Sequence, residues 1–345
     1  MKDRIRDQYY DLIKGVLIIL VVFGHILPET NFLHIYIYSF HMPAFFIVNG
    51  MLLNHTAFTK KTFFGRKGVL LRGIKAIMIP YCIYAVVLSL TRWVFAGFDL
   101  GNLKWQVIDF FSLSGIGATW FLPCLFIGQV ITFAIILFSG AVSRKIPFHY
   151  AEKIIILFIG IVMFFCAFYA REVKGTLVFI RACIAGAFIL IGYCFYEIIN
   201  LLRTRNVLTT ALVTIGALAV HICAFHFTKE KTVAINSLHI NNPFTFLINA
   251  ILGSLVVILL CVNVEKIPLE KCKKALSFYG KNSLTIMGTH QILMLVLFIP
   301  IVKNYLLNVV FTLLILAVEF PIILIQNKLK KRKRAKSGET NGKRS

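Results

Sequence analysis

Ten apolar stretches, each about as long as a bilayer is thick, constrain the fold of this 345-residue chain more than any other feature. A helix that crosses the hydrocarbon core needs about 20 mainly apolar residues, and about 17 are tolerated. Backbone polar groups must be satisfied inside a bilayer, so such stretches form helices. The sequence therefore predicts an all-α, polytopic membrane helix bundle with about ten transmembrane helices. The stretches cover residues 12–28, 33–53, 76–95, 119–138, 153–170, 178–198, 207–227, 244–263, 283–301 and 305–327.

The composition excludes an ordinary soluble fold. Apolar residues make up 59% of the chain and charged residues only 15%, whereas a soluble domain has about 25% charged residues. A cytosolic enzyme, a disordered protein and a disulfide-stapled secreted module are therefore excluded. The segments between the stretches are too short for a further domain; the longest are 54–75, 96–118 and 264–282. We expect one integral-membrane domain over residues 1–327 and a basic, disordered tail over 328–345 that binds anionic lipid headgroups.

Basic residues are distributed unevenly between the two sides of the predicted bundle. The chain has 37 Lys and Arg against 14 Asp and Glu, a net charge of +23. When the stretches alternate in direction, 28 basic residues fall on one side and 8 on the other, and Lys14 lies inside the first stretch. Cytoplasmic segments of membrane proteins retain Lys and Arg. The split predicts that both termini are cytoplasmic, and no nucleic-acid partner is needed to explain the charge.

Eight cysteines are scattered along the chain, nearly all of them within the apolar stretches. No two have the Cys-x-x-Cys spacing of a zinc site or a redox motif. We interpret them as small hydrophobic residues, and we predict no metal site.

Ionisable residues in the first stretch are the first candidates for chemistry, because each costs on the order of 3 kcal/mol at the centre of a bilayer. Asp11 and Lys14 are spaced i,i+3 and can pair on one helical face. His25 follows Lys14 by about three turns, or about 16 Å of helix, and projects from nearly the same face. Together these residues describe a polar track through the membrane. The alternative is that Asp11 and Lys14 lie at the interface and His25 simply packs in the bundle.

The second stretch contains His41 and Pro43. It runs in the opposite direction to the first, so His41 can lie at a depth similar to that of His25. Pro43 removes a backbone donor, and we expect a kink there that opens space beside the histidine. Two histidines that face each other across adjacent helices favour a functional site over ordinary packing.

Five segments resemble motifs of one known family. They are DLIKGVLIILVVFGH (11–25), FHMPAFFIVNG (40–50), a basic stretch leading into Ile79-Pro80-Tyr81, TWFLPCLF (119–126) and YGKNSLTIMGTH (279–290). In this order, over about residues 6–290, they resemble the membrane-integral acyltransferase-3 family. The similarity is to its fucose 4-O-acetylase-like and polysaccharide O-acetyltransferase branch in particular. The ten predicted spans match the number usual in that family.

The resemblance implies a membrane-bound O-acyltransferase of the bacterial cytoplasmic membrane. Its donor would be an acyl-CoA, with acetyl-CoA as co-substrate and no bound cofactor. Its acceptor would be a sugar hydroxyl of a cell-surface polysaccharide or of the lipid-linked precursor. The family pattern Asp-x-x-(Arg/Lys)-Gly…His falls on Asp11, Lys14, Gly15 and His25, and an Arg-x-x-Arg pair is matched in part by Arg72 and Lys75. Lysine keeps the charge of arginine but loses its bidentate fork. We expect Asp11, Lys14, Arg72 and Lys75 to bind the donor, the three cations holding its phosphates on the cytoplasmic side.

The resemblance also implies that His25 is catalytic. A neutral imidazole has the basicity to take a proton from an attacking hydroxyl, or it can hold the acetyl group as a transient acyl-imidazole. Glu29, four residues after His25, can orient the ring or can simply lie at the interface. His41 can bind the acceptor or donate to the developing oxyanion.

Four further residues are candidates for binding the acceptor. Trp120 can stack on a sugar ring or anchor its helix in the aromatic belt. Asn282 and Ser283 can contact the sugar or cap a helix. His290 lies well inside the ninth stretch, where an ionisable residue is costly.

Two other classes of function compete with the enzyme. A transporter or flippase of a glycan or small organic acid would also have polar groups at mid-membrane and a Pro-broken helix. Proton-coupled transporters usually use intramembrane Asp or Glu, whereas the best-placed groups here are imidazoles. A structural scaffold leaves the paired histidines without a reason. The enzyme is therefore the leading hypothesis.

Overall fold

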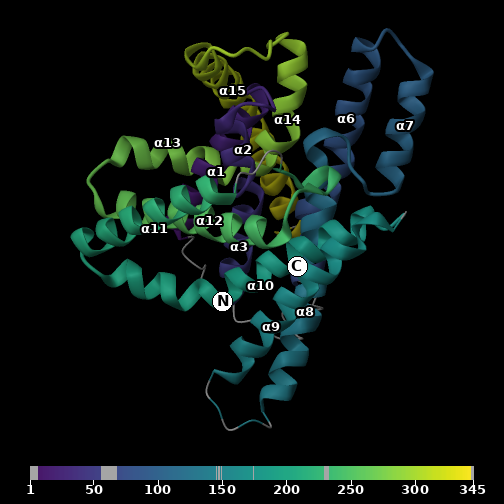
Figure 1. Cartoon of the computed structure of the whole chain (residues 1–345). Helices are drawn as coiled ribbons and strands as arrows, with labels where there is room; N and C mark the ends of the chain where they lie inside the picture. The colour runs from purple at the N-terminus through teal and green to yellow at the C-terminus, as the bar shows by residue number, and fades with distance from the viewer. Residues whose placement is uncertain are drawn as a thin grey trace.

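The computed structural model describes residues 7–55, 68–144, 146, 148, 150–173, 175–228 and 233–342, nearly all of them helical (Figure 1). In the first half the elements are α1 (Gln8–Ile26), α2 (Phe32–Tyr38), α3 (His41–His55), α5 (Val69–Gly73), the π-helix η1 (Ile74–Met78), α6 (Ile79–Phe95), α7 (Leu100–Phe111), the short η2 (Gly117–Trp120), α8 (Phe121–Ser143) and α9 (Ala151–Tyr169). They are followed by η3 (Ala170–Glu172), α10 (Leu177–Thr204), α11 (Val207–Thr228), β1 (Val233–Ala234), η4 (Ile235–Ser237), β2 (His239–Ile240), α12 (Pro243–Lys266), α13 (Glu270–Lys281), α14 (Ser283–Val296) and α15 (Tyr305–Gly342). β1 and β2 pair antiparallel and form a two-stranded hairpin.

The predicted helical membrane bundle is confirmed. Within the described residues, nine helical stretches are long and apolar enough to cross a bilayer. The predicted ninth span, 283–301, is shorter than expected, because α14 ends at Val296. The chain then turns at Phe298, which has a positive φ of 49°, and Pro300 cannot continue a helix. The cytoplasmic location of both termini stays a prediction.

The second predicted span is broken into two helices. The break falls at Ser39 and Phe40, between α2 and α3, and not at Pro43, where we expected the kink. Pro43 is the third residue of α3 and so lies in its first turn. Backbone N–H groups in the first turn of a helix have no intrahelical acceptor. A proline is therefore tolerated there without bending the helix. The break places His41 at the first turn of α3.

A π-helical turn precedes α6. Residues Ile74–Met78 form this turn, and Pro80 follows at the start of α6. Pro80 has no N–H to donate to the preceding turn and its ring crowds that turn. An extra residue in the turn relieves this conflict. Lys75 lies in this turn, and Arg72 lies in α5 directly before it.

Two helices occupy segments that looked like connections. α7 lies within 96–118, and it forms a hairpin with α6 (Figure 1) held by the Tyr81 hydroxyl, which donates to the Phe110 carbonyl at 2.9 Å. α13 lies within 264–282 and packs against α1. Both have 12 residues, which is too few to span a bilayer. The length and apolarity that indicate a membrane span therefore do not predict these two helices.

The last helix continues beyond the predicted membrane domain. α15 runs to Gly342 and so includes most of residues 328–345, for which the sequence predicts a disordered tail. Lys and Arg have high helix propensity, and this segment has no Pro and no Gly before Gly338. The helix that begins in the apolar stretch therefore continues through the basic one.

The core of the bundle forms where helices approach closely through glycine. A side chain at Gly50 of α3 would overlap the Ile189 carbonyl of α10, and one at Gly192 of α10 would overlap the Ile47 carbonyl of α3. α1, α3, α10 and α12 contribute most of the fully buried apolar residues. In Figure 1 α8 and α9 run side by side at the bottom of the view, and α6 and α7 stand at the upper right.

Candidate active site

A cavity of about 620 Å³ lies between α1, α2, α3, α6, α10 and α14. The β-hairpin after α11 also lines it, through residues 233–237 and His239. The cavity wall is rich in polar side chains, which are costly to bury without a partner or a ligand. The polar lining residues include His25, His34, Tyr38, His41, Arg92 and Arg181.

His25 lies in the last turn of α1, and its ring reaches the cavity. Its Nδ1 lies 3.1 Å from the hydroxyl oxygen of Tyr38 on α2. One proton is shared in this hydrogen bond, so either the hydroxyl or Nδ1–H is the donor. The bond fixes the ring plane and leaves Nε2 as the second functional nitrogen. α1 ends at Ile26 because Pro28 disfavours the helical conformation at Leu27, which is extended.

Two more histidines contact Tyr38. The His34 ring stacks on the tyrosine ring with centroids 3.8 Å apart, and its Nδ1–H donates to the Gly24 carbonyl at 2.9 Å. The His41 ring meets the tyrosine edge at 4.7 Å, and its Nδ1–H donates to the Ile37 carbonyl at 2.8 Å. His41 therefore keeps an Nε2 lone pair toward the cavity. The structure brings His25 and His41 to one cavity, with Tyr38 between them.

His290 lies directly beside His25. The two ring centroids are 5.1 Å apart, and the Nδ1–H of His290 donates to the Ile286 carbonyl at 2.7 Å. Its Nε2 is buried and has no hydrogen-bond partner in the part of the chain that the structure describes. A buried nitrogen without a partner is costly. His290 is thus positioned to accept a proton or a hydrogen bond next to His25.

Two arginines line the same cavity. Arg181 of α10 is 6% exposed, donates from Nη1 to the Ser114 carbonyl at 2.8 Å and lies over the Trp120 ring at 5.6 Å. Arg92 of α6 reaches the cavity beside Gly117. In the sequence both arginines count only as basic residues on the side of the bundle with fewer cations. Their positions inside the predicted stretches 76–95 and 178–198 were the signal that could have identified them.

Glu29 and Trp120 line the cavity, but with contacts other than those expected. Glu29 lies beyond the end of α1, where the i,i+4 spacing from His25 no longer places two residues on one face. The residue that orients His25 is Tyr38, which sequence reasoning missed. Trp120 is 9% exposed, and its ring supports Arg181.

The predicted donor residues lie on two different parts of the bundle. Lys14 pairs with the buried Asp11 at 3.0 Å, which confirms the predicted i,i+3 pair. Arg72 and Lys75 are exposed on α5 and η1, which pack against α6 and α8. A shared role of these residues in donor binding stays a prediction.

The face of α1 between Lys14 and His25 is apolar. It contains Ile18 and Val21, both fully buried in the core cluster. Ile18 packs in the core and Val21 lines the cavity, so no polar side chain lies on this face between Lys14 and His25. The expectation of a polar track along α1 was therefore wrong.

Asn282 and Ser283 lie at the junction of α13 and α14, away from the histidines. Asn282 donates to the Phe278 carbonyl at 2.7 Å and accepts from Asn327 at 3.2 Å, so its hydrogen bonds join helices. Ser283 begins α14, about two turns or ~10 Å along the helix from His290. Asn282 is the N-cap residue of α14, but its side chain makes no capping hydrogen bond there, so the roles of both residues stay predictions.

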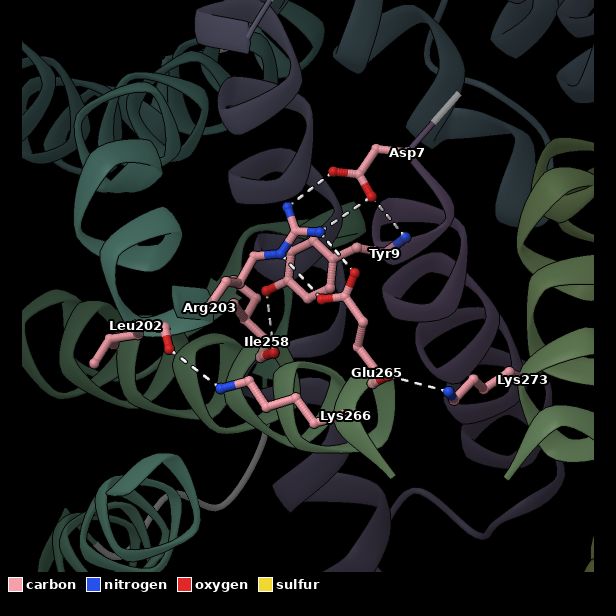
Figure 2. A network of polar contacts seen from close by, with 8 residues as sticks. All are labelled: Asp7, Tyr9, Leu202, Arg203, Ile258, Glu265, Lys266 and Lys273. Carbon is pink, nitrogen blue, oxygen red and sulfur yellow. Dashed lines mark hydrogen bonds and ion pairs between the residues drawn. The ribbon is translucent and has the colours of Figure 1, made fainter. Parts of the chain in front are cut away.

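A second polar centre joins α1, α10 and α12 (Figure 2). Arg203 donates to both carboxylate oxygens of Asp7, at 2.8 and 3.2 Å, and to both of Glu265, at 3.0 and 2.7 Å. Its guanidinium also lies 4.2 Å from the centre of the Tyr9 ring. Asp7 caps the first turn of α1 by accepting from the Tyr9 amide. This centre fixes the end of α1 that lies opposite His25.

The described part of the chain contains no cluster of metal ligands. Among the residues that the structure describes, no group of three or more His, Cys, Asp and Glu side chains is arranged to hold an ion. The histidines around Tyr38 use Nδ1 for hydrogen bonds to a hydroxyl or to carbonyls. Their arrangement suits proton transfer and hydrogen bonding to a ligand.

Comparison with known proteins identifies the family. A sequence model described as an acyltransferase domain matches residues 7–325, nearly the whole chain. The chain belongs to the acyltransferase-3 family. This acyltransferase-3 protein is a multi-pass membrane protein.

One curated relative and the solved structures complete the comparison. The acyltransferase-3 chain is similar to nodulation protein NolL of Sinorhizobium fredii (strain NBRC 101917 / NGR234), with 34% identity over 127 residues. This match covers 34% of the chain and 33% of the relative, so the chain spans about a third of the length of the curated relative that it matches. No solved structure matches the chain.

Proposed function

We propose that this acyltransferase-3 protein is a membrane-bound O-acetyltransferase of the bacterial cytoplasmic membrane. In this proposal it transfers an acetyl group from acetyl-CoA to a sugar hydroxyl of a cell-surface polysaccharide or its lipid-linked precursor. Family membership supports acyl transfer. The observation that carries the proposal is the position of His25 in the wall of a 620 Å³ cavity, with its ring oriented by Tyr38.

The direct route uses His25 as a general base. Nε2 takes the proton of the acceptor hydroxyl while the hydroxyl oxygen bonds to the thioester carbon. The carbon–sulfur bond then breaks, and the proton passes from the imidazolium to the coenzyme A thiolate. If Nδ1–H donates to the Tyr38 oxygen, this hydrogen bond strengthens as the ring becomes positively charged.

The two-step route passes through an acyl-imidazole. His25 attacks the thioester carbon, the thiolate leaves as coenzyme A, and the acceptor hydroxyl then displaces the imidazole. In this route Nε2 of His290, which has no hydrogen-bond partner among the described residues, is a base close enough to assist the second step. Both routes need His25. In both, the residues proposed to bind the donor phosphates are Lys14, Arg72 and Lys75.

The test is thioester cleavage coupled to acetylation. Protein reconstituted in nanodiscs receives acetyl-CoA and a panel of sugar acceptors, and the released coenzyme A thiol and the acetylated sugar are measured together. His25→Gln is expected to lower both by about 100-fold or more without changing the unfolding temperature. His226→Gln, at an exposed position on α11, is the matched control.

Two results would count against the proposal. Unchanged acetyl transfer by His25→Gln removes His25 from the mechanism. Movement of a glycan across the membrane without cleavage of acetyl-CoA supports the transporter or flippase. Mass spectrometry of surface polysaccharide from deletion and parent strains then identifies the acyl group and the acceptor position.

A further inference from the structure

The two arginines of the cavity do not have the partners that buried guanidiniums normally have. A charge taken out of water is stable only when it is paired and hydrogen-bonded. Arg181 has one hydrogen bond, to a neutral carbonyl, and its buried Nε has no partner within the described ranges. Across those same residues, neither Arg181 nor Arg92 forms an ion pair with a carboxylate. The site is therefore incomplete as it stands.

The nearby acidic groups form no ion pair with either arginine among the described residues. Asp109 of α7 interacts electrostatically with both arginines, but it is exposed to solvent and is not among the described residues that line the cavity. Glu29 lines the cavity but is exposed to solvent. Two guanidiniums thus face the cavity, and among the described lining residues the exposed Glu29 is the one that is acidic.

The positions of the arginines match the reacting histidine. Arg92 interacts electrostatically with His25, and both arginines share its cavity. The Trp120 ring supports the Arg181 guanidinium, and Gln291 accepts from the Ala118 amide at 2.9 Å beside Arg92. The Arg181 guanidinium is therefore held in place by the Trp120 ring and the Ser114 carbonyl before any ligand enters.

We propose that Arg92 and Arg181 form an oxyanion subsite, so that the acceptor is an anionic glycan that presents a phosphate or carboxylate next to the reacting hydroxyl. The proposal rests on the proposed acetyltransferase function and specifies its acceptor class. A guanidinium binds either oxyanion with two parallel hydrogen bonds. An anion held there fixes the sugar relative to His25, and a neutral sugar leaves both guanidiniums without a partner. Discrimination against neutral sugars follows, because unpaired buried groups are costly.

The experiment measures binding, which does not depend on turnover. Full-length protein in nanodiscs is titrated with glucose 1-phosphate, glucuronate and methyl glucoside, which differ in the anionic group. We expect at least one anionic sugar to bind about ten-fold or more tightly than methyl glucoside. Glucose 1-phosphate and glucuronate distinguish a phosphate from a carboxylate as the natural group.

The variants assign the preference to the arginines. Arg92→Gln should reduce the preference for the anionic sugar about ten-fold. Arg181→Gln should do the same, and Arg181→Lys should restore part of it, because lysine keeps the charge without the fork. Lys104→Gln removes an exposed cation from α7 and should keep the preference. Because Arg181 also supports the Ser114 carbonyl, the half-buried Arg92 provides the decisive variant if Arg181→Gln does not fold.

Failure of this proposal is distinct from failure of the proposed function. Equal binding of all three sugars by the unchanged protein overturns the anion subsite, whether or not thioester cleavage occurs. An unchanged preference in Arg92→Gln also overturns it. If both arginine variants lose coenzyme A binding, with no difference among the sugars, the pair binds the donor and the proposal is wrong. His25→Gln should keep the anion preference while losing acetyl transfer, which separates recognition from chemistry.

Discussion

The hydroxyl oxygen of Tyr38 lies 3.1 Å from Nδ1 of His25, and this bond joins α2 to α1. The tyrosine ring is held from both sides, by a stacked His34 and by the edge of His41. A hydroxyl fixed in this way determines which face of the His25 ring meets the cavity. In the proposed mechanism, the reactivity of His25 therefore depends on a residue that does not itself react.

Replacing the tyrosine tests this dependence. Tyr38→Phe removes one neutral hydrogen bond, worth about 1 kcal/mol, and should lower kcat for acetyl transfer about five-fold with the unfolding temperature nearly unchanged. Tyr36→Phe is the matched control, because Tyr36 lies on the same helix as Tyr38 and its hydroxyl bonds to a different histidine, Nδ1 of His221 on α11, at 2.9 Å. Equal loss of kcat in the two variants would show that the effect is general to α2.

The contact between α1 and α13 should not tolerate a methyl group. A Cβ at Gly280 would overlap the Asp11 carbonyl and crowd the Gly15 amide. Gly280→Ala should therefore destabilise the protein by about 1–3 kcal/mol, measured as a lower unfolding temperature in detergent. Gly216→Ala is the opposite case, because nothing lies within 4 Å of that Cβ, and it should stabilise the helix by up to about 1 kcal/mol. Two variants with the same stability would contradict the close approach.

The polar centre at Arg203 should contribute measurably to stability. Arg203→Gln removes the cation that joins the Asp7 and Glu265 carboxylates. The three side chains are 21%, 24% and 33% exposed, so we expect a loss of about 2 kcal/mol, between the values for surface and buried pairs. Arg144→Gln, at an exposed position after α8, is the control. A double-mutant cycle with Asp7→Asn should give a coupling of about 1 kcal/mol, and a coupling of zero would show that the contact is not energetically important.

Donor binding by the η1 segment can be tested with a charge-preserving change. Lys75→Gln should raise KM for acetyl-CoA about three- to ten-fold, and Lys75→Arg should lower it, because arginine restores the bidentate fork. The effect should fall on KM more than on kcat, as expected for binding that is equal in the ground and transition states. If KM is the same in both variants, Lys75 does not contact the donor phosphates.

The membrane helices were predictable because a bilayer requires uniform apolarity over a fixed length. α7 and α13 were not, because each is only 12 residues long and is stabilised by contacts with other helices, such as the bond from Tyr81 to Phe110. The break before His41 was also placed wrongly. Proline at the start of a helix and proline inside one look alike in sequence.

The candidate site was predictable only in part. His25, His41 and His290 stand out because imidazoles are rare in lipid, and the structure brings them together. Tyr38 did not stand out, because tyrosine is common near membrane interfaces. Arg92 and Arg181 were counted only toward the charge difference between the two sides of the membrane. Their approach to one cavity depends on how α6 and α10 pack, which a sequence pattern does not give.

The long sequence separation within the Arg203 centre has a consequence for biogenesis. Arg203 follows Asp7 by 196 residues, and at about 5–20 residues per second a ribosome needs about 10–40 s to add them. Glu265 arrives later still. During this time the helix that contains His25 rests in the bilayer with its first carboxylate unclamped. The enzyme's first helix is thus among the last to be locked, and a nascent chain released early would lack the anchor that aligns its histidine.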